Sequence, residues 1–232
     1  MTYEEYEQLE QERIARNIAY MEAGVRFVDL KAAYIDDGVK IGRGTVIYPC
    51  VVIEGDVTIG EDCTIGQNSR IVDSVIGDRT SVQSSVILES RVGNDTKIGP
   101  FAYLRPNSTI GDECKVGDFV EVKNSSMGDG AKASHLTYIG DSDVGSKVNL
   151  GCGVVFVNYD GSKKYRSIVE DGAFIGCNSN LVSPVHVGKE AYVAAGSTIT
   201  EDVPDGALYV ARARGSIHEG WVDKKGILKK DK

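Results

Sequence analysis

The sequence predicts an all-β fold, a parallel β-helix with one helix at its N-terminus. Aliphatic residues recur every six positions over most of the chain, a helical segment precedes them, and a polar tail follows. A period of six fits neither an amphipathic helix nor a long alternating strand. It fits a solenoid in which each hexapeptide makes one short face and a corner, so that three hexapeptides close a triangular coil. We therefore expect a helical arm at 1–24, a β-helix at 25–203 and a C-terminal tail at 204–232.

The repeat can be followed through about 28 apolar positions, enough for about nine coils. Each coil hides its apolar side only by stacking on its neighbours, so the number of repeats builds the core. Glycine commonly follows the aliphatic residue, and we expect it there because a sharp corner needs unusual backbone angles. The series begins with Ile35, Ile41, Ile47, Ile53 and Ile59 and closes with Ile175, Leu181, Val187, Val193 and Ile199.

A helix is predicted at 2–22, ahead of the repeats. Thr2 and Glu5 have the spacing of a capping box. Because apolar side chains lie roughly along one face of this helix, we expect it to cover the first coil. These apolar residues are Tyr3, Tyr6, Ile14, Ile18 and Met21.

Two further segments depart from the repeat. The interval of thirteen residues between Phe156 and Val169 contains FVNYDGSKKYR and must loop out of the solenoid wall. Such interruptions often carry function. The tail after Val203 ends in GWVDKKGILKKDK and is too polar for another coil. We interpret the tail as a solvated terminus, with a contribution to a neighbour's cofactor site as the alternative.

Composition excludes several classes of protein. The net charge of -8 argues against general nucleic-acid binding, which depends on basic patches. There is no apolar run of about 18 residues, as a membrane-spanning helix would need, and the N-terminus lacks the apolar core of a signal peptide. We therefore expect a cytoplasmic protein without a membrane or nucleic-acid partner.

The five cysteines are scattered and form no CxxC pair, which gives no indication of a zinc site of that kind. We expect them to be small buried residues in a reduced compartment. They are Cys50, Cys63, Cys114, Cys152 and Cys177.

The stretch 98–160 stands out from the repeat and carries a family resemblance. Its motifs include GPFAYLRP, VGDFVEVKN, SHLTYIGD, VNLGCG and VNYDG. With AAGSTIT and HEGW further on, the chain resembles, over nearly its whole length, the C-terminal acetyltransferase half of the bacterial bifunctional N-acetylglucosamine-1-phosphate uridyltransferase / glucosamine-1-phosphate acetyltransferase. The resemblance implies a left-handed β-helix, whereas ordinary parallel crossovers are right-handed. It also implies a homotrimer with its sites between subunits.

The reaction implied by this resemblance is transfer of an acetyl group from acetyl-CoA to the amine of glucosamine 1-phosphate. The product, N-acetylglucosamine 1-phosphate, is a precursor of UDP-N-acetylglucosamine and so of the cell wall. The amine must lose a proton as it attacks the thioester, and His135 is similar to the family's base. The oxyanion needs a donor, and the backbone N–H near Cys152 corresponds to the family's candidate.

The resemblance also assigns substrate contacts. Arg105, Lys123 and Lys164 match phosphate and sugar contacts, where Arg grips phosphate in two places and Lys acts as a point charge. Tyr138 and Asn149 match polar residues that hold the sugar, and so do Asn158 and Tyr159. The residues assigned to acetyl-CoA are Cys152, Asn158, Tyr159, Cys177, Ala195 and Arg212, with Arg212 nearest to the cofactor's phosphates. No metal ligand is assigned.

Each assignment has a simpler competitor. Arg105 and Lys123 could be solvated charges of the wall, and NYDG could be an ordinary turn. His186 and His218 match no family position and are interpreted as structural. The chain departs from the family at Asn107, where Gly is usual, at Cys177, where a small hydroxyl residue is often found, and at Cys152, usually a small residue. These departures put fine cofactor contacts in doubt rather than the reaction.

Other functions stay open. A γ-type carbonic anhydrase shares the solenoid but needs three histidine ligands, and one of the three histidines here is in the tail. Acyl transfer to a different amine is a second possibility, and a non-catalytic trimeric scaffold is a third. The chain carries nothing that resembles the family's N-terminal nucleotide-binding half. We therefore expect a free-standing acetyltransferase or a piece of a longer protein, without uridyltransferase activity of its own.

Overall fold

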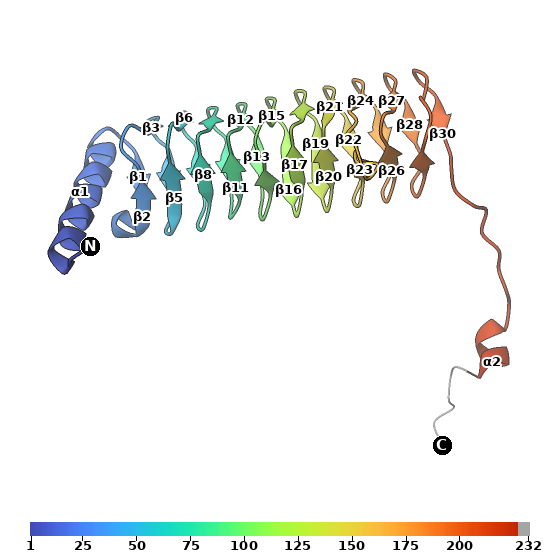
Figure 1. The fold of residues 1–232 in the computed structure, drawn as a ribbon, viewed down its shortest axis with the longest axis horizontal. Helices are drawn as coiled ribbons and strands as arrows, with labels where there is room; N and C mark the ends of the chain where they lie inside the picture. The colour runs from blue at the N-terminus through green and yellow to red at the C-terminus, as the bar shows by residue number, and fades with distance from the viewer. Residues whose placement is uncertain (227–232) are drawn as a thin grey trace.

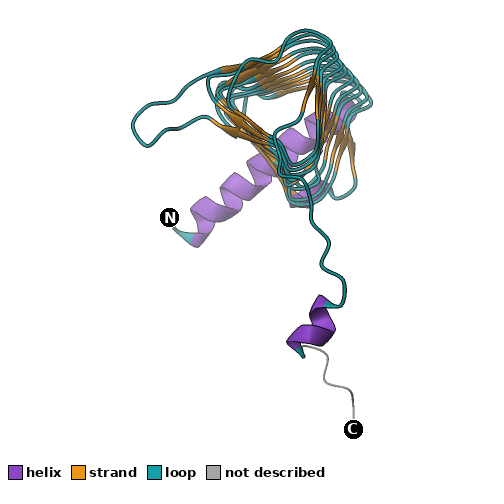
Figure 2. Ribbon diagram, turned by 90° about the vertical axis from the view of Figure 1, so that its right-hand side faces the viewer, coloured by secondary structure: helices purple, strands orange, loops and turns teal. Residues whose placement is uncertain are grey.

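The computed structural model describes residues 1–226 and has the predicted architecture, a parallel β-helix with one N-terminal helix (Figure 1). Viewed along its axis, the solenoid is a triangular prism (Figure 2). Three parallel sheets form its faces, and strands three apart in the chain pair within the same sheet, except that β30 pairs with β28. The solenoid has about ten turns, against about nine expected from the repeat. The difference arises because β1 (Arg26–Phe27) and β30 (Leu208–Tyr209) extend one sheet at both ends of the apolar series.

We call the three faces sheets A, B and C in the order in which the chain visits them. Besides β1 and β30, sheet A contains β4 (Val46–Ile47), β7 (Thr64–Ile65), β10 (Ser81–Val82), β13 (Lys97–Ile98), β16 (Lys115–Asp118), β19 (Lys132–His135), β22 (Asn149–Leu150), β25 (Phe174–Ile175) and β28 (Tyr192–Val193). Sheet B contains β2 (Ala33–Ile35), β5 (Val51–Glu54), β8 (Arg70–Val72), β11 (Val86–Leu88), β14 (Tyr103–Leu104), β17 (Glu121–Lys123), β20 (Tyr138–Gly140), β23 (Val155–Val157), β26 (Asn180–Val182) and β29 (Thr198–Ile199). Sheet C contains β3 (Lys40–Ile41), β6 (Thr58–Ile59), β9 (Val75–Ile76), β12 (Arg91–Val92), β15 (Thr109–Ile110), β18 (Ser126–Met127), β21 (Ser142–Val144), β24 (Ser167–Val169) and β27 (His186–Val187). The turns from A to B form corner AB, and the turns from C to A form corner CA.

The core is a set of aliphatic ladders inside the prism. Ile47 pairs with Ile65 on the next coil, and Leu104 pairs with Val122, all four fully buried. Burying one such side chain stabilises the fold by about 1.5–3 kcal/mol. Because every rung repeats this contact, the strands stack in fixed register and hold each outward side chain at a set position along its face.

The glycines after the aliphatic residues have a different cause from the one expected, so that prediction is wrong. Gly42 does not have a left-handed φ, and a Cβ there would lie 2.5 Å from the carbonyl of Gly60 on the next coil. Close stacking of the coils therefore demands glycine. The left-handed angles fall two positions later, on residues with side chains such as Asp62, Glu113 and Phe119. Such a conformation costs an L-residue roughly 1–2 kcal/mol.

Helix α1 (Tyr3–Glu22) begins with the predicted capping box and covers the first coil, but a polar face makes the contact. Arg13 Nη1 donates to the carbonyl oxygen of Ala33 at 2.7 Å, and Asn17 Nδ2 donates to the same oxygen at 3.0 Å. The end of a solenoid presents unpaired carbonyl groups, so donors suit it better than apolar side chains. The apolar row is largely exposed at Tyr3, Tyr6, Ile18 and Met21.

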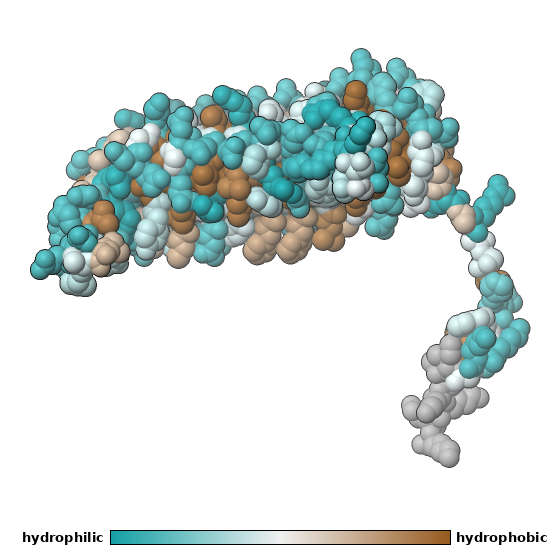
Figure 3. All heavy atoms as spheres, viewed as in Figure 1, coloured by the Kyte–Doolittle hydropathy of each residue, from teal (hydrophilic) through white to brown (hydrophobic). Residues whose placement is uncertain are grey.

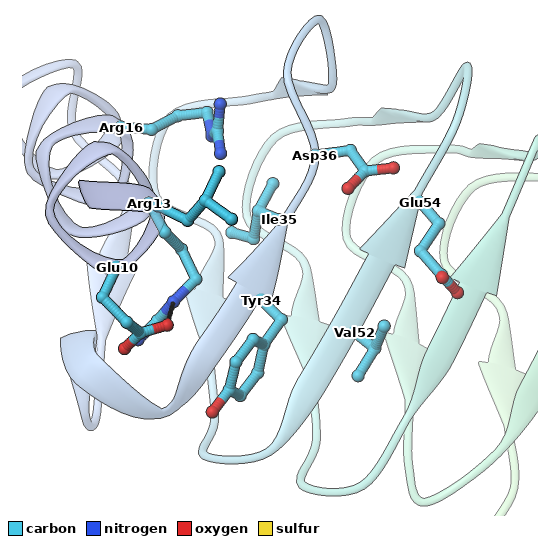
Figure 4. Close-up of a pocket in the computed structure, with 9 residues that line it drawn as sticks. Glu10, Arg13, Arg16, Tyr34, Ile35, Asp36, Val52 and Glu54 are labelled. Carbon is cyan, nitrogen blue, oxygen red and sulfur yellow. Dashed lines mark hydrogen bonds and ion pairs between the residues drawn. The ribbon is translucent and has the colours of Figure 1, made fainter. Parts of the chain in front are cut away.

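A hollow of about 580 Å³ lies between α1 and the first strands of sheet B (Figure 4). Arg13 and Arg16 reach into it from the helix, and Asp36 and Glu54 line it from the wall. Cys177 and Ala195 lie at the opposite end of the solenoid from this hollow.

The remaining segments lie outside the regular coils. The loop between β23 and β24 leaves the wall as expected from the gap in the repeat. Beyond residue 203 the chain adds β30 to sheet A, so the solenoid continues into the segment assigned to the tail. Two short helices, η1 (Leu30–Ala32) and α2 (Trp221–Lys225), complete the elements, and no helix within residues 1–226 is long and apolar enough to cross a membrane.

Candidate active site

His135 stands at corner AB with a carboxylate beside it. It ends β19, and the register places it directly over Asp118 at the end of β16. The two atoms Nδ1 of His135 and Oδ1 of Asp118 are 2.8 Å apart. This hydrogen bond holds the pKa of Asp118 below its usual range. With Asp118 ionised, the imidazole proton is on Nδ1, which leaves Nε2 free to accept a proton.

Corner AB continues from His135 through three other predicted residues. Strand pairing aligns the aliphatic residues of four consecutive coils, and each predicted residue comes two positions after its aliphatic residue. Equivalent positions on neighbouring strands are about 4.8 Å apart. The structure therefore brings these residues into one straight column, His135, Cys152, Cys177 and Ala195.

The backbone N–H groups of this column are open. Within residues 1–226, those of Cys152, Cys177 and Ala195 donate no hydrogen bond to the protein. The next coil adds Arg212, whose Cδ lies 3.9 Å from the place of a Cβ on Gly196. A row of unpaired donors that ends at a guanidinium can bind an extended ligand with carbonyl groups and a phosphate.

A cationic cluster occupies the edge of sheet B where its strands turn toward sheet C, across that sheet from corner AB. Lys123 Nζ lies 3.4 Å from Asp141 Oδ2, and Asp141 also accepts hydrogen bonds from Asn124, at 2.6 Å, and Asn158. Burial acts to raise the pKa of Asp141, but the two amide donors and the Lys123 ammonium outweigh it and keep the pKa low. Asp141 therefore stays ionised and holds both Lys123 and Asn158 in place. Asn158 Nδ2 also lies 3.4 Å from Tyr138 Oη.

Lys164 reaches this cluster from the projecting loop. The neighbouring Lys123 amine lowers the pKa of Lys164. A bound anion would favour the protonated form of both amines.

Arg105 lies one coil before Lys123 on the same line along sheet B. Its Nη1 donates to Glu121 Oε1 at 2.8 Å. On the coil after Lys123, the same line is occupied by Gly140. A Cβ there would come within 2.4 Å of Tyr138 Oη and 2.7 Å of Asn158 Nδ2. Gly140 therefore makes room for the polar side chains that border the cluster.

The projecting loop is fixed at its base. Arg166 donates to both carboxylate oxygens of Asp143 and, at 2.9 Å, to the carbonyl oxygen of Asn124. The loop itself closes as the turn expected from NYDG, with an antiparallel bridge between Tyr159 and Lys164. Tyr159 is exposed at the side of the loop. The loop is thus held so that Lys164 stays over sheet B.

The predicted site residues divide between two faces of the prism. Lys123 and Tyr138 are on strands of sheet B, Arg105 and Asn158 directly follow strands of that sheet, and Asn149 is on sheet A, in register with Lys132. Outward side chains of two faces of a triangular prism point in different directions, so one chain does not bring Asn149 to the cationic cluster.

Known proteins resemble the chain over most of its length. The bacterial transferase hexapeptide model, of six repeats, matches residues 38–73, 89–124 and 166–201. The bifunctional protein GlmU of Clostridium botulinum (strain Kyoto / Type A2) is 57% identical over 214 residues, 92% of this chain and 47% of GlmU. GlmU of Geobacillus sp. (strain WCH70) is 57% identical over 225 residues, 97% of this chain and 49% of GlmU. The chain is a hexapeptide-repeat homologue of the C-terminal half of GlmU.

The chain spans about half the length of the GlmU relatives it matches. Among solved structures, the Arabidopsis UDP-N-acetylglucosamine acyltransferase covers 88% of this chain and 76% of its own, at 17% identity and a TM-score of 0.47.

Sequence reasoning missed the partners of the predicted residues in this GlmU homologue. Asp118 and Asp141 hold His135 and Lys123, and both stand inside motifs quoted for the resemblance. A carboxylate within VGDFVEVKN and another within SHLTYIGD were the available signals. Arg166 was missed as well, although it ends the loop sequence that the repeat had singled out.

The positions of Asn107 and of the cysteines in the coils explain why these residues are tolerated there. Asn107 has a φ of 63°, a left-handed angle that Asn tolerates better than most side chains. Cys63 and Cys114 are buried as expected. The expectation is wrong for Cys50 and Cys177, which are exposed, because both occupy corner AB.

The other histidines form no metal site with His135. His186 lies on sheet C, where its Nε2 is 3.1 Å from Glu170 Oε1. His218 follows the solenoid and contacts Ser216. Among the residues that the structure describes, no three His, Cys, Asp or Glu side chains are grouped as metal ligands.

Proposed function

We propose that the chain transfers the acetyl group of acetyl-CoA to the amine of glucosamine 1-phosphate. The observation that carries this proposal is the position of the His135–Asp118 pair. It stands where the column of open N–H groups on corner AB begins, at one edge of sheet B, and the cationic cluster occupies the other edge of that sheet. A base thus lies between a binding surface for an extended acyl carrier and one for a phosphate.

The proposed transfer uses His135 as the base. Nε2 accepts a proton from the sugar amine as the amine nitrogen attacks the thioester carbon. The carbonyl oxygen becomes an oxyanion and accepts a hydrogen bond from the Cys152 N–H. The C–S bond then breaks, and the proton held by His135 passes to the CoA thiolate. Asp118 keeps the imidazole oriented and stabilises its charged form.

The acceptor is proposed to bind by its phosphate. Arg105 and Lys123 are successive cations on sheet B, and Lys164 completes the group from the loop. Three cations in one place favour a dianionic phosphate over a neutral sugar. Tyr138 and Asn158 border the cluster and would hold sugar hydroxyl groups, which favours an amino-sugar phosphate over amino acids as acceptor.

The donor is proposed to extend along corner AB. The open N–H groups of Cys177 and Ala195 would donate to the carbonyl groups of the pantetheine arm. Arg212 would meet the phosphates, and Tyr159 would contact the cofactor from the loop. The choice of acetyl-CoA over longer acyl-CoA belongs to this proposal, as does a cytoplasmic location.

The active assembly is proposed to be a homotrimer. Asn149 on sheet A contributes to a site whose cations are on sheet B, and a second copy supplies one face to the other. A neighbour that places its sheet A beside this sheet B brings Asn149 to Lys123. Repeating this contact closes a ring.

The test is release of free thiol from acetyl-CoA in the presence of glucosamine 1-phosphate. Wild-type protein should turn over, His135→Ala should lose turnover by about 10²–10⁴-fold, and His186→Ala should keep it. His186 is a matched control because it also bonds a carboxylate of the neighbouring coil, on another sheet. Absence of turnover on any amino-sugar phosphate would favour a non-catalytic scaffold. Turnover on a different amine alone would replace the acceptor, and formation of UDP-N-acetylglucosamine from added UTP would contradict the expected lack of uridyltransferase activity.

A further inference from the structure

Two cysteines stand next to each other on the open column of corner AB. Cys152 and Cys177 each come two positions after an aliphatic residue of sheet A, Leu150 and Ile175, and these two aliphatic residues pair with each other. No other coil carries a cysteine at this position. The proposed transfer uses only the backbone N–H groups of the two cysteines, so their thiols have no part in it.

The stacking of the coils brings these two thiols within reach of each other. The N–H of Asn178 donates to the carbonyl oxygen of Cys152 at 2.8 Å, which holds one corner on the other. A Cβ on Gly151 would lie 2.9 Å from Cys177 Cα, so the two coils are in close contact here. Equivalent Cα atoms on neighbouring strands are about 4.8 Å apart, inside the range of about 4.4–6.8 Å that a disulfide spans. The pair can therefore close to a disulfide with little movement of the backbone.

The cysteines inside the prism are protected from reaction. Cys63 Sγ donates to the carbonyl oxygen of Gly77 at 3.0 Å, and Cys114 Sγ donates to that of Gly128 at 3.1 Å. Burial raises the pKa of both thiols. Because a thiol attacks a disulfide only as its thiolate, these two cysteines are poor nucleophiles.

Cys152 and Cys177 are open to a reactant. Cys177 is exposed and Cys152 is half-buried. Figure 3 shows the segment beyond β30 leading away from the prism, so the described part of that segment does not cover the column. Both thiols therefore adjoin the surface proposed to bind the pantetheine arm.

The place of the donor's sulfur indicates the reactant. In the proposed transfer the thioester carbon lies between His135 Nε2 and the Cys152 N–H, so the sulfur of bound CoA lies beside Cys152. A CoA disulfide bound in the same way presents its S–S bond there. The Cys152 thiolate attacks the sulfur of the bound CoA, and the second CoA leaves as a thiolate. Cys177 then attacks the Cys152 sulfur, the bound CoA leaves, and the two cysteine protons pass to the two CoA thiolates.

We propose that Cys152 and Cys177 are a thiol pair that reduces CoA disulfide to CoA and is itself oxidised to a disulfide. This inference rests on the donor surface of the proposed function and adds a second reaction at that surface. The cross-link lies where the pantetheine arm would bind, so the oxidised chain should not transfer acetyl groups. A thiol reductant restores both the pair and the column.

The test incubates the reduced full chain with CoA disulfide and follows the products by mass spectrometry. A tryptic digest of the wild-type chain should yield Cys152 and Cys177 in one disulfide-linked peptide. Cys177→Ser should stop at the mixed disulfide, with one CoA on Cys152. Cys50→Ser is the matched control, because Cys50 is exposed on the same corner with no cysteine on a neighbouring coil, and it should form the link as the wild type does. Hydroxyethyl disulfide, which lacks the nucleotide, should close the pair at least about ten-fold more slowly than CoA disulfide.

The outcomes separate this inference from the proposed function. A wild-type chain that forms no linked peptide overturns the thiol pair, and so do equal rates with the two disulfides, whether or not the chain transfers acetyl groups. A linked peptide that forms faster with CoA disulfide supports the thiol pair even if the wild-type protein transfers no acetyl group. In that case the proposed function fails and the thiol pair stands. In a chain that does transfer, acetyl transfer should be lost on oxidation and return with dithiothreitol.

Discussion

Corners AB and CA are made from the same repeat, yet their backbone N–H groups are paired differently. On corner CA, the N–H two positions after the aliphatic residue donates to a side chain of the next coil. Glu61 donates to Asp78 at 2.9 Å, and Asn94 donates to Asp112 at 2.7 Å. On corner AB, the equivalent N–H groups of Cys152 and Cys177 are unpaired within the described chain. A carboxylate ladder satisfies one corner, and its absence leaves the other open for a ligand.

The two corners also differ in what a change to them should do. Side chains of corner CA accept hydrogen bonds that hold coils together, so their loss should affect stability. Side chains of corner AB and of sheet B face a proposed ligand, so their loss should affect turnover. Variants at matched positions can therefore separate stability from catalysis.

The largest effect among these comparisons should come from the carboxylates beside the two histidines. Asp118→Asn should lower kcat by about 10²-fold, because the amide can donate to Nδ1 and hold the imidazole in the wrong tautomer, and because it no longer stabilises the imidazolium; both KM values should stay unchanged. Glu170→Gln, beside His186, should leave kcat as it is. Steady-state kinetics of both variants checks this, and equal effects would show that Asp118 has no special part.

A bulky side chain on the open column should weaken donor binding. Ala195→Leu should raise the KM for acetyl-CoA about ten-fold, equivalent to roughly 1.4 kcal/mol, with the KM for glucosamine 1-phosphate unchanged. Lys189 occupies the matched position on corner CA, two residues after Val187. Lys189→Leu should therefore change neither KM. If Ala195→Leu raises only the KM for the sugar phosphate, the donor does not lie along this column.

The lowered pKa of Lys164 predicts a pH dependence of acceptor binding. A lysine with a lowered pKa loses its charge at a lower pH than usual, so the KM for the sugar phosphate should rise a few-fold as pH increases through that pKa. Lys164→Arg keeps its charge, because a guanidinium stays protonated throughout the working pH range, and should remove most of this rise. A KM profile unchanged in Lys164→Arg would place the titration elsewhere.

The smallest effect should come from one step of the carboxylate ladder. Asp112→Ala removes the acceptor of the Asn94 N–H and should lower the free energy of unfolding by about 1 kcal/mol. For a chain of this size the melting temperature should fall by roughly 2–4 °C. Cys152→Ala removes no acceptor of a corner N–H and should shift it by less. Calorimetry checks both, and kcat of Asp112→Ala should equal that of the wild-type chain.

The fold could be predicted from the sequence because the repeat is local and strict. Ile47, Ile65 and their equivalents recur at a fixed interval, and one interval suffices to set a coil. The role of the repeated glycines could not be predicted, because it comes from the neighbouring coil and no single hexapeptide shows it. The C-terminal end of the solenoid could not be predicted for a related reason, since β30 pairs with sheet A without the apolar pattern of the middle coils.

The site was predictable where a motif carried it and hidden where contacts cross between coils. His135 and Lys123 stand in specific motifs, whereas their carboxylates are 17 and 18 residues away in sequence. Stacking of the coils brings them together. Asn149 could be assigned from resemblance, but its place on sheet A follows only from the register. This separation is what makes a second copy part of the proposed site.

The most direct test is complementation between two inactive variants, Asn149→Ala and Lys123→Ala. Each variant alone should lack acetyl transfer, because every site in its trimer misses one contact. In a co-expressed mixture, random assembly into cyclic trimers should restore about a quarter of the sites. The thiol-release rate of the mixture should then far exceed the sum of the separate rates. A mixture no more active than its components would contradict a site shared between sheet A of one copy and sheet B of another.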